Sequence, residues 1–347
     1  MSLLPTLRLS FERLAPTAAG DAVIVAFSGG VDSTALLWGL AELARRGELP
    51  VTPVAAHLDH ALDAGSAARA ARAARLAADL GVPFVSARRE VAAGRGSASL
   101  EAAARQARYD FLEDVRGRRG ARWIATAHHL DDQAETVLLR LAFGSGLAGL
   151  AAIRPRRGAL VRPLLSLPKA ALQAAVAAAG LAAVDDPTNA DLRVPRNRIR
   201  HLLLPALAAA EPGLADLPER LARLACRAAG ARERLERRCP APEASGPPSI
   251  SRAALAGLPP PLAQIELALL HSRAGAPYPP AAAARRELFR QLAAGGAVGC
   301  DCGAGWRWEG KGDAILVRRA RSEAADGFAY TLETGATARI AELTEST

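Results

Sequence analysis

The segment Asp21–Arg46, DAVIVAFSGGVDSTALLWGLAELARR, decides the fold of this 347-residue chain. Its apolar first part, Asp21–Phe27, predicts a buried strand, and Thr34–Arg46 predicts a helix. Between them lies Ser28–Ser33 (SGGVDS), whose two adjacent glycines allow a tight turn directly into that helix. A strand, a glycine-rich turn and a helix in this order predict the opening unit of an α/β fold.

The same alternation continues over the following residues. Short apolar runs predict strands at Val51–His57, Pro83–Ala87 and Trp123–Thr126. Stretches rich in alanine, leucine and arginine predict helices at Ser66–Leu80, Ser99–Arg118 and Asp131–Phe143. Strands joined by crossover helices predict a doubly wound parallel sheet that is covered by helices on both faces. Ligands of such sheets bind at the carboxyl ends of the strands, which is where the SGGVDS turn lies.

Beyond Pro205 the strand signal ends and the pattern becomes helical. A helical stretch at Ala215–Arg238 is followed by a Pro/Gly/Ser-rich linker at Cys239–Ser249 and by mostly helical sequence at Leu255–Ala294. Looser alternation within Cys300–Arg319 predicts a small hairpin, and residues 320–347 give no prediction. We therefore expect an α/β domain at 1–212, a helical domain at 213–295, and a small C-terminal segment at 296–347 with a possible hairpin and a flexible tail.

The SGGVDS turn has the composition of a phosphate-binding loop. Gly29 and Gly30 let the backbone approach a phosphate, and Ser33 stands where the helix start favours an anion. Asp32 would repel a bare phosphate, so we expect it to hold a Mg²⁺ that bridges phosphate oxygens. The turn is not a Walker loop, because no Gly-Lys-[Ser/Thr] follows the glycines.

Composition narrows the class of partner only modestly. The formal charge of +9 favours a polyanion such as nucleic acid. Lys169 and Lys311 are the only lysines, however, so nearly all the positive charge is arginine in an alanine-rich chain, as codon bias would also produce. No apolar run is long enough for a membrane span, and the start has no signal-peptide pattern, so a cytoplasmic protein without membrane contact is expected.

The SGGVDS string resembles the loop of the N-type ATP-pyrophosphatase superfamily, whose fold is adenine nucleotide α-hydrolase-like. The resemblance implies that ATP is a co-substrate and that it is cleaved between its α- and β-phosphates. It implies ATP-binding roles for the loop and a strand-end histidine, namely Ser28, Gly29, Gly30, Val31, Asp32, Ser33 and His57. His57 can equally be a hydrogen-bonded strand-end histidine that contacts no ligand.

Four further segments resemble tRNA(Ile)-lysidine synthetases in order and spacing, over roughly residues 20 to 205. They are AHLDHAL at 56–62, EAAARQARY at 101–109, TAHHLDDQAET at 126–136 with GSGL at 144–147, and DPTN at 186–189 followed by RNRIRH at 196–201 and LLP at 203–205. The resemblance implies ligation of L-lysine to the wobble cytidine of a tRNA(Ile) with a CAU anticodon. It implies that residues 1–212 form the catalytic domain and that the helical residues 213–295 bind the tRNA. It leaves homodimer formation open.

The third of these segments supplies the main catalytic candidates. His128, Asp132 and Glu135 fall at i, i+4 and i+7, so a helix would present them on one face. Such carboxylates can hold cations and accept protons. The resemblance extends the catalytic set to Asp32, His128, His129, Asp132, Glu135, Arg108 and Arg200. Arg105, Arg196 and Arg198 are candidates for contact with ATP or tRNA phosphates, although Arg105 and Arg198 can equally be solvated surface residues.

One position departs from the family. Lysidine synthetases usually carry arginine after the leucine of the His-x-x-His-x-Leu segment, where this chain has Asp63. The contact of that arginine must be lost or supplied from elsewhere, and Arg69 and Arg72 are candidates.

Three alternatives belong to other classes. A tRNA thiolase of the same superfamily carries sulfur on a cysteine or an iron–sulfur cluster, but the four cysteines, Cys226, Cys239, Cys300 and Cys302, all lie beyond residue 225. A glutamine-fed amidotransferase needs a glutaminase, for which we see no room before residue 20. A basic RNA-binding module that is not an enzyme would leave the phosphate loop unexplained.

Overall fold

The computed structural model describes residues 2–60, 65–89, 97–142, 147–183, 191–236, 248–276, 280, 282–303 and 305–320. The predicted motif residues at 61–63, 144–146 and 186–189, most of the predicted linker, and residues 321–347 lie outside these ranges. The chain divides into two compact units, Met1–Cys239 and Pro240–Thr347. None of the helices in the described ranges has the length and apolar character that a membrane span requires.

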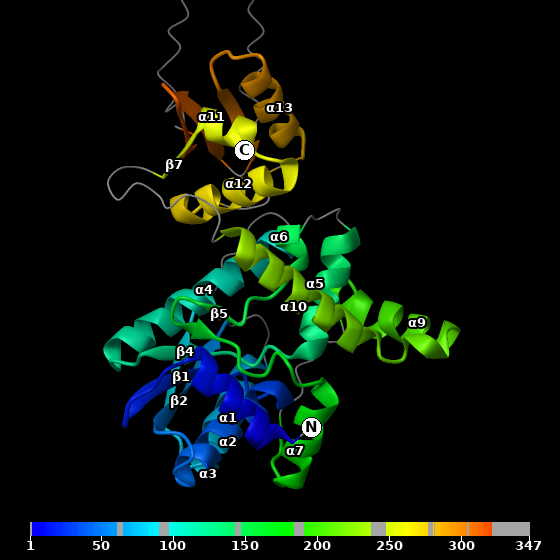
Figure 1. Cartoon of the computed structure of the whole chain (residues 1–347). Coiled ribbons are helices and arrows are strands. Elements are labelled where there is room, and N and C mark those ends of the chain that lie inside the picture. The colour runs from blue at the N-terminus through cyan, green and yellow to red at the C-terminus, as the bar shows by residue number, and fades with distance from the viewer. Residues whose placement is uncertain are drawn as a thin grey trace, which may run out of the picture. The chain divides into compact units, whose positions relative to one another are not determined.

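The first unit contains a six-stranded sheet with strand order β3-β2-β1-β4-β6-β5 (Figure 1). Its strands are β1 Asp21–Ala26, β2 Val51–Asp59, β3 Phe84–Arg88, β4 Trp123–Ala125, β5 Arg156–Arg157 and β6 Leu160–Val161. In the sheet, β3, β2, β1, β4 and β6 pair with their neighbours in parallel, and the edge strand β5 runs antiparallel to β6. The predicted α/β class with a mostly parallel sheet is confirmed.

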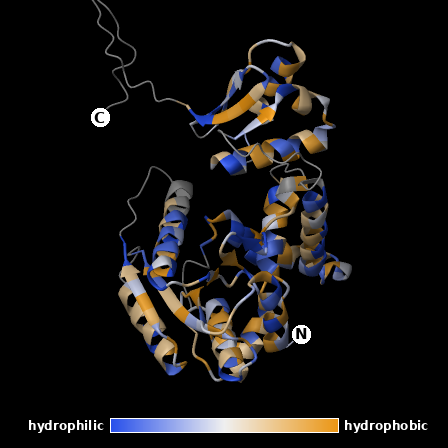
Figure 2. Ribbon diagram, turned by 60° about the vertical axis from the view of Figure 1, so that its left-hand side comes forward, coloured by the Kyte–Doolittle hydropathy of each residue, from blue (hydrophilic) through white to orange (hydrophobic). Residues whose placement is uncertain are grey.

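Helices cover both faces of this sheet, because alternate residues of each strand point to opposite sides. Val23 and Val25 of β1 pack in one apolar cluster with α1 (Leu3–Leu14), α2 (Val31–Arg45), α3 (Ser66–Asp79) and α7 (Lys169–Ala178). Ile24 packs on the other face against α4 (Ser97–Arg118). The helices show mixed hydrophobic and hydrophilic residues around their surfaces, as helices packed on one side do (Figure 2).

The strand order determines where a ligand can lie. The chain leaves β1 for β2 on one side, and after β3 it crosses to the other side of β1 to form β4. Strands β1 and β4 are therefore neighbours whose following segments turn in opposite directions, and a crevice opens between their carboxyl ends. The SGGVDS turn follows β1, and the TAHHLDD segment follows β4 as it enters α5 (Leu130–Ala142).

A second group of helices continues from α5. It comprises α6 Leu147–Leu150, α8 Pro195–Arg198, a π-helical turn at Ile199–Leu203, α9 Leu204–Ala210, a 3₁₀ turn at Pro212–Leu214 and α10 Leu217–Glu236. Helix α10 packs on α5, where Leu221 and Ala225 meet Ala134 and Val137 in a small apolar cluster. These contacts place α10 within the first unit.

The second unit is an antiparallel sheet with helices packed on it. Its strands, in the order β7-β10-β9-β8, are β7 Ser249–Ser251, β8 Gly299–Gly303, β9 Trp306–Lys311 and β10 Ala314–Arg319. The helices are α11 Arg252–Gly257, α12 Pro260–Ala274 and α13 Ala282–Ala293. Fully buried Trp308 lies in their common core with Leu267 and Leu288. The predicted hairpin is thus part of a sheet whose remaining edge strand, β7, the sequence did not predict.

The observed division differs from the expected boundaries at residues 212 and 295. Helix α10 packs on α5 and so joins the first unit, while α11 to α13 share one core with β8 to β10. Elements of the first unit that were not predicted include α1, the β5–β6 hairpin, α6, α7 and α9. Helix α1 has its apolar residues Leu3, Leu7 and Phe11 four positions apart, on one buried face.

We predict that α1 stabilises the first unit through its buried face. Phe11 is fully buried, so Phe11→Ala should lower the free energy of unfolding by about 3–5 kcal/mol. The matched control is Leu9→Ala on the same helix, because Leu9 is 61% exposed and its truncation should change stability by no more than about 0.5 kcal/mol. Urea unfolding followed by circular dichroism measures both, and equal effects would contradict the packing of α1.

Candidate functional site

The loop after β1 is held in shape by its own serines. Gly29 adopts a positive φ of 83°, which a side chain would disfavour. The Ser28 and Ser33 hydroxyls lie 3.1 Å apart, and the Ser33 hydroxyl donates to the Gly30 carbonyl oxygen at 3.0 Å. Gly30 caps α2, and Val31 is its first residue, so the first backbone N–H groups of α2 are free of intrahelical partners. This arrangement suits a phosphate.

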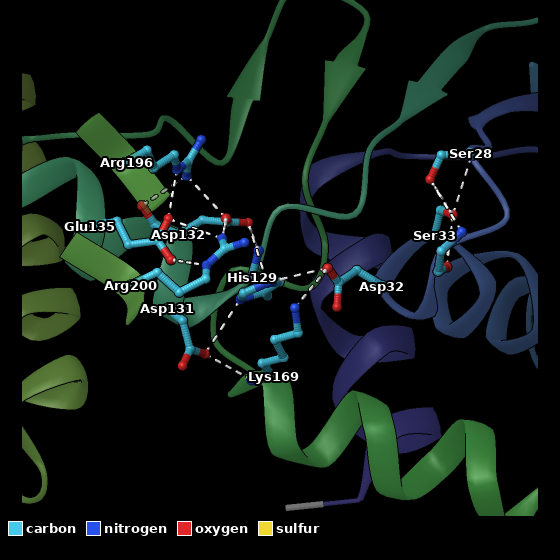
Figure 3. A network of polar contacts seen from close by, with 11 residues as sticks. Ser28, Asp32, Ser33, His129, Asp131, Asp132, Glu135, Lys169, Arg196 and Arg200 are labelled. Atoms are coloured by element: carbon cyan, nitrogen blue, oxygen red, sulfur yellow. Dashed lines mark hydrogen bonds and ion pairs between the residues drawn. The ribbon is translucent and has the colours of Figure 1, made fainter. Parts of the chain in front are cut away.

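Asp32 points from the first turn of α2 across the crevice toward the segment that follows β4 (Figure 3). Its Oδ2 lies 3.5 Å from His129 Nε2 and 3.9 Å from Lys169 Nζ. Its Oδ1 is buried and has no hydrogen-bond partner in the described part of the chain. Asp32 therefore has one oxygen beside two cationic side chains and one that is left for a further ligand.

His129 lies at the centre of an acidic cluster. Its ring is 1% exposed, with Asp131 Oδ2 at 3.3 Å from Nδ1 and Asp132 Oδ2 at 3.6 Å from Nε2. Burial disfavours the imidazolium, but the carboxylates of Asp131, Asp32 and Asp132 outweigh it and raise the pKa of His129 to about 9. His129 is therefore a cation at neutral pH that holds three carboxylates together.

The second half of the cluster consists of two arginines around Glu135. The Glu135 side chain has no exposed surface, and its oxygens accept from Arg196 Nε and Arg200 Nε, each at 2.6 Å (Figure 3). Asp132 Oδ1 also pairs with both arginines, at 3.0 Å from Arg196 Nη2 and 3.3 Å from Arg200 Nη2. Arg196 belongs to α8 and Arg200 to the π-helical turn, so these pairs fasten that segment to α5. Glu135 is enclosed by its partners rather than presented to a ligand.

The predicted helical face of three residues is only partly formed. Asp132 and Glu135 lie on α5, but His128 precedes the helix, which begins at Leu130. His128 Nδ1 lies 2.9 Å from the Thr126 hydroxyl. Burial, with added repulsion from nearby arginines such as Arg162 and Arg196, lowers the pKa of His128 to about 3 despite the attraction of Asp132. His128 is therefore neutral at pH 7.

A separate group of residues lies at the end of β2. His57 is buried, and its Nδ1 lies 2.9 Å from the Phe27 carbonyl oxygen, next to the SGGVDS loop. Burial is the largest cause that lowers the pKa of both His57 and His60, and the positive charge of Arg108 adds to it. His57 thus lies at the strand end beside the loop, and Arg108 is near enough for its charge to act on both histidines. The charge of Arg69 also reaches His57.

Two predicted phosphate ligands make local contacts. Arg105 lies over the Tyr109 ring at 5.1 Å and donates to its hydroxyl at 3.1 Å. Arg198 donates to the carbonyl oxygens of Leu192 and Arg193 at 3.0 and 3.2 Å. Both side chains are exposed on their helices, and neither belongs to the ion-pair cluster around His129.

Two residues of the cluster, Asp131 and Lys169, were not among the predicted site residues. The Asp131 carboxylate accepts from the backbone N–H of Lys169 at 2.8 Å, which joins the start of α7 to the start of α5. Both residues line a pocket of about 260 Å³ together with Arg200. The remaining lining residues are mainly apolar and include Leu204, Pro205, Ala208 and Leu214. A signal was available for Lys169, because it is one of only two lysines and follows a proline, a helix-start pattern.

The donor set can accept Mg²⁺ together with a nucleotide. The described residues contain no preformed group of three metal-binding side chains. Mg²⁺ is usually held by one or two carboxylates plus substrate phosphates, so a full protein cage is not required. The unpaired buried Oδ1 of Asp32, at the start of the helix that follows the phosphate loop, fits such a role.

Fold and site together define the class: an α/β protein whose glycine-rich loop receives a phosphate-bearing nucleotide at the β1–β4 crevice. The PP-loop domain family model matches residues 4–207, and the chain belongs to this family. Its PP-loop implies ATP binding.

Several curated proteins named tRNA(Ile)-lysidine synthase are similar to this chain. The one from Geobacter sulfurreducens is 46% identical over 211 residues, which cover 59% of this chain and 44% of the relative. The one from Methylobacterium nodulans is 46% identical over 222 residues, covering 60% and 62%. The one from Thermus thermophilus is 45% identical over 199 residues, covering 56% and 38%. The chain thus spans about half the length of the curated relatives it matches.

Among solved structures, the U34-tRNA thiolase NcsA from Methanococcus maripaludis with its [4Fe-4S] cluster matches with a TM-score of 0.50. The match covers 70% of this chain and 81% of that one at 15% sequence identity. At this identity the likeness supports the fold alone.

We predict that Glu135 is needed chiefly to fasten the arginine segment. Glu135→Gln removes the charge that Arg196 and Arg200 share, and should destabilise the first unit by roughly 3 kcal/mol, the low end for breaking a buried ion pair, because the arginines are partly exposed. Glu113→Gln, which removes an exposed partner of Arg116, should cost less than about 1 kcal/mol. Urea unfolding compares the two variants, and a loss of stability in Glu135→Gln as small as that in Glu113→Gln would contradict this role.

A second prediction concerns pH. The pKa of His129 is about 9 in the folded protein against about 6.5 unfolded, so its stabilising contribution is complete below pH 6.5 and lost as pH rises through 9. The stability difference between the unmodified chain and His129→Gln should therefore shrink from pH 6 to pH 9.5. Urea unfolding in magnesium-free buffer measures it. A difference that does not change with pH would show that His129 is not held as a cation.

Proposed function

We propose that this chain ligates L-lysine to C2 of the wobble cytidine in the CAU anticodon of tRNA(Ile), which forms lysidine with consumption of ATP. The observation that carries the proposal is the identity of 41–46% to curated lysidine synthases. The matched family region, residues 4–207, contains the SGGVDS loop and every member of the ion-pair cluster from Asp32 to Arg200.

The chemistry has two steps. The C2 oxygen of the cytidine attacks the α-phosphorus of ATP, pyrophosphate leaves, and the base is adenylated. The ε-amine of lysine then attacks C2, and AMP leaves. The loop residues Ser28 to Ser33 would bind the ATP phosphates, and Asp32 would hold Mg²⁺, which neutralises phosphate charge when bound. Lys169 and His129, both beside Asp32, would add fixed positive charge near the phosphates.

The 260 Å³ pocket is our candidate for the lysine site. Its apolar wall, which includes Leu204 and Leu214, suits the aliphatic stem of lysine. Its polar wall has two carboxylates and two cations for the charged ends. Asp131 would face the ε-ammonium, and Arg200 the α-carboxylate. Glu135 contacts the pocket but is covered by its arginines, so we assign it a positioning role.

The amine must lose a proton before it attacks, because a lysine ammonium has a pKa of about 10.4. The histidines of the free protein are poorly suited to accept it: the pKa of His129 is raised to about 9, so it already carries a proton, and that of His128 is lowered to about 3. Despite its burial, hydrogen bonds from His129 and from the Lys169 backbone hold the pKa of Asp131 below its usual value, so Asp131 is also a weak base. We therefore propose that the Asp131 carboxylate orients the ε-ammonium by charge and that the proton leaves to water.

Sulfur transfer is disfavoured by the positions of the thiols. Cys226 is exposed on α10, and Cys300 and Cys302 lie in the second unit. Burial raises the pKa of both Cys300 and Cys302, that of Cys302 to about 11, which leaves little of the reactive thiolate. In the described part of the chain, no thiol lies in the ion-pair cluster.

The decisive assay combines the protein with ATP, labelled lysine and a tRNA(Ile) transcript with a CAU anticodon. We expect lysine-dependent labelling of the tRNA and stoichiometric AMP and pyrophosphate. Asp32→Asn should lower both pyrophosphate release and labelling by about 10²–10³-fold, as the loss of one charge-stabilising group does. The control Asp114→Asn removes an exposed carboxylate on α4 and should leave both rates unchanged.

Two results would overturn the proposal in different ways. Formation of AMP and pyrophosphate without lysine in the tRNA would retain an ATP-pyrophosphatase but reject lysidine synthesis. Full activity of Asp32→Asn would remove the SGGVDS loop from the reaction.

A further inference from the structure

The solvent-facing flank of helix α10 carries a row of arginines. Arg220, Arg223 and Arg227 are exposed on this helix, and Arg234 continues the row near its end. At 100° per residue these four positions fall within a sector of about 60°, and they extend over about 21 Å of helix length. The buried face of α10, with Leu221, Ala225 and Ala228, lies on a different side of the helix. We name the four residues the α10 arginine row.

The arrangement is polarised around the helix. Glu219, Cys226 and Glu233 project from a neighbouring sector rather than alternating with the arginines. Asp216 lies at the start of the row, where it pairs with Arg220 at 2.8 Å and with Arg223 at 3.7 Å. Arg227 and Arg234 form no ion pair with any residue in the described ranges. A solvated surface helix more often mixes both signs of charge on each flank.

The row begins beside the candidate site. Ala215, just before α10, and Pro218, in its first turn, line the same 260 Å³ pocket as Asp131 and Lys169. Arg220 follows two residues later and also donates to the Gly213 carbonyl oxygen at 2.9 Å, which fixes its position near the pocket. Because Leu221 and Ala225 pack on α5, the helix that carries the row is attached to the helix that carries Asp131 and Asp132.

We propose that the α10 arginine row binds the sugar–phosphate backbone of the RNA substrate, on the stretch of strand that adjoins the base held in the site. This inference rests on the proposed function. A base can reach a crevice at the end of a sheet only if its own strand passes the mouth of that crevice, and α10 starts there. Guanidinium groups match phosphates in geometry and charge, and a row along one helix follows a strand without reading its bases.

The experiment measures the salt dependence of RNA binding. The row variant replaces Arg223, Arg227 and Arg234 by serine and keeps Arg220, because Arg220 holds the backbone at Gly213. The control variant replaces Arg45, Arg118 and Arg119 by serine. These are exposed arginines at or just beyond the carboxyl ends of α2 and α4, at the edge of the sheet opposite the site. Both variants lose the same charge.

We expect the row variant to bind a tRNA(Ile) transcript less tightly than the control, by at least about tenfold at 0.1 M salt. Each lost phosphate contact should reduce the magnitude of the negative slope of log K against log salt by about 0.7–0.9. The slope should therefore become less steep by about 2 in the row variant and by less than about 0.5 in the control. ATP binding should be equal in the two variants. Equal slopes and affinities for RNA would overturn the inference.

The outcomes separate this inference from the proposed function. If the unmodified chain transfers lysine but both variants show the same salt dependence of RNA binding, the role of the α10 arginine row is rejected and the ligase activity is retained. A lower slope in the row variant, with no lysine transfer by any variant, supports the row and rejects lysidine synthesis. A row variant that loses binding to an acidic protein such as casein, but binds RNA as the control does, would also contradict the inference. It would show that the row binds acidic proteins and not the RNA backbone.

Discussion

The adjacency of β1 and β4 is the constraint on which the site depends. Parallel pairing of Val23 to Val25 with Trp123 to Ala125 brings the two strand ends to one edge. Each strand is followed within a few residues by a helix whose first turn carries aspartates, Asp32 on α2 and Asp131 and Asp132 on α5. These carboxylates would repel one another across the crevice. His129, buried between them as a cation, makes the arrangement stable.

A second attachment extends the site beyond the sheet. Glu135 lies three residues after Asp132 on α5, and its pairs with Arg196 and Arg200 hold the segment that leads through the π-helical turn into α9 and α10. The same segment supplies the apolar wall of the pocket through Leu204 and Leu214. A carboxylate that is covered by its arginines thus determines where the residues that line the pocket lie. Loss of Glu135 would therefore affect the pocket without any direct contact to a ligand.

Much of this was predictable because the pattern is local. The SGGVDS loop, its strand and its helix follow from apolar runs and glycine positions within Asp21–Arg46, and the predicted bounds differ from the observed ones by a few residues. The proximity of Lys169 to Asp32 was not predictable, because it depends on a contact between residues 137 positions apart that only the packed sheet creates. The charge state of His128 and His129 was equally hidden. The two neighbours differ because burial, with added repulsion from arginines, lowers the pKa of His128, whereas the carboxylates around His129 outweigh its burial and raise its pKa.

The balance of charge in the cluster bears on how the site would accept its ligands. Four carboxylates, on Asp32, Asp131, Asp132 and Glu135, are matched by four cations, on His129, Lys169, Arg196 and Arg200. The cluster is therefore close to neutral in the free protein and does not repel a polyanionic nucleotide. Any charged ligand must therefore arrive with a counterion or form an ion pair with a residue that is already paired within the cluster. A nucleotide that draws Lys169 and His129 toward its phosphates would release negative charge on Asp32 and Asp131. That released charge is what a divalent cation and an incoming ammonium group each require, so binding of the nucleotide would prepare the site for the other two.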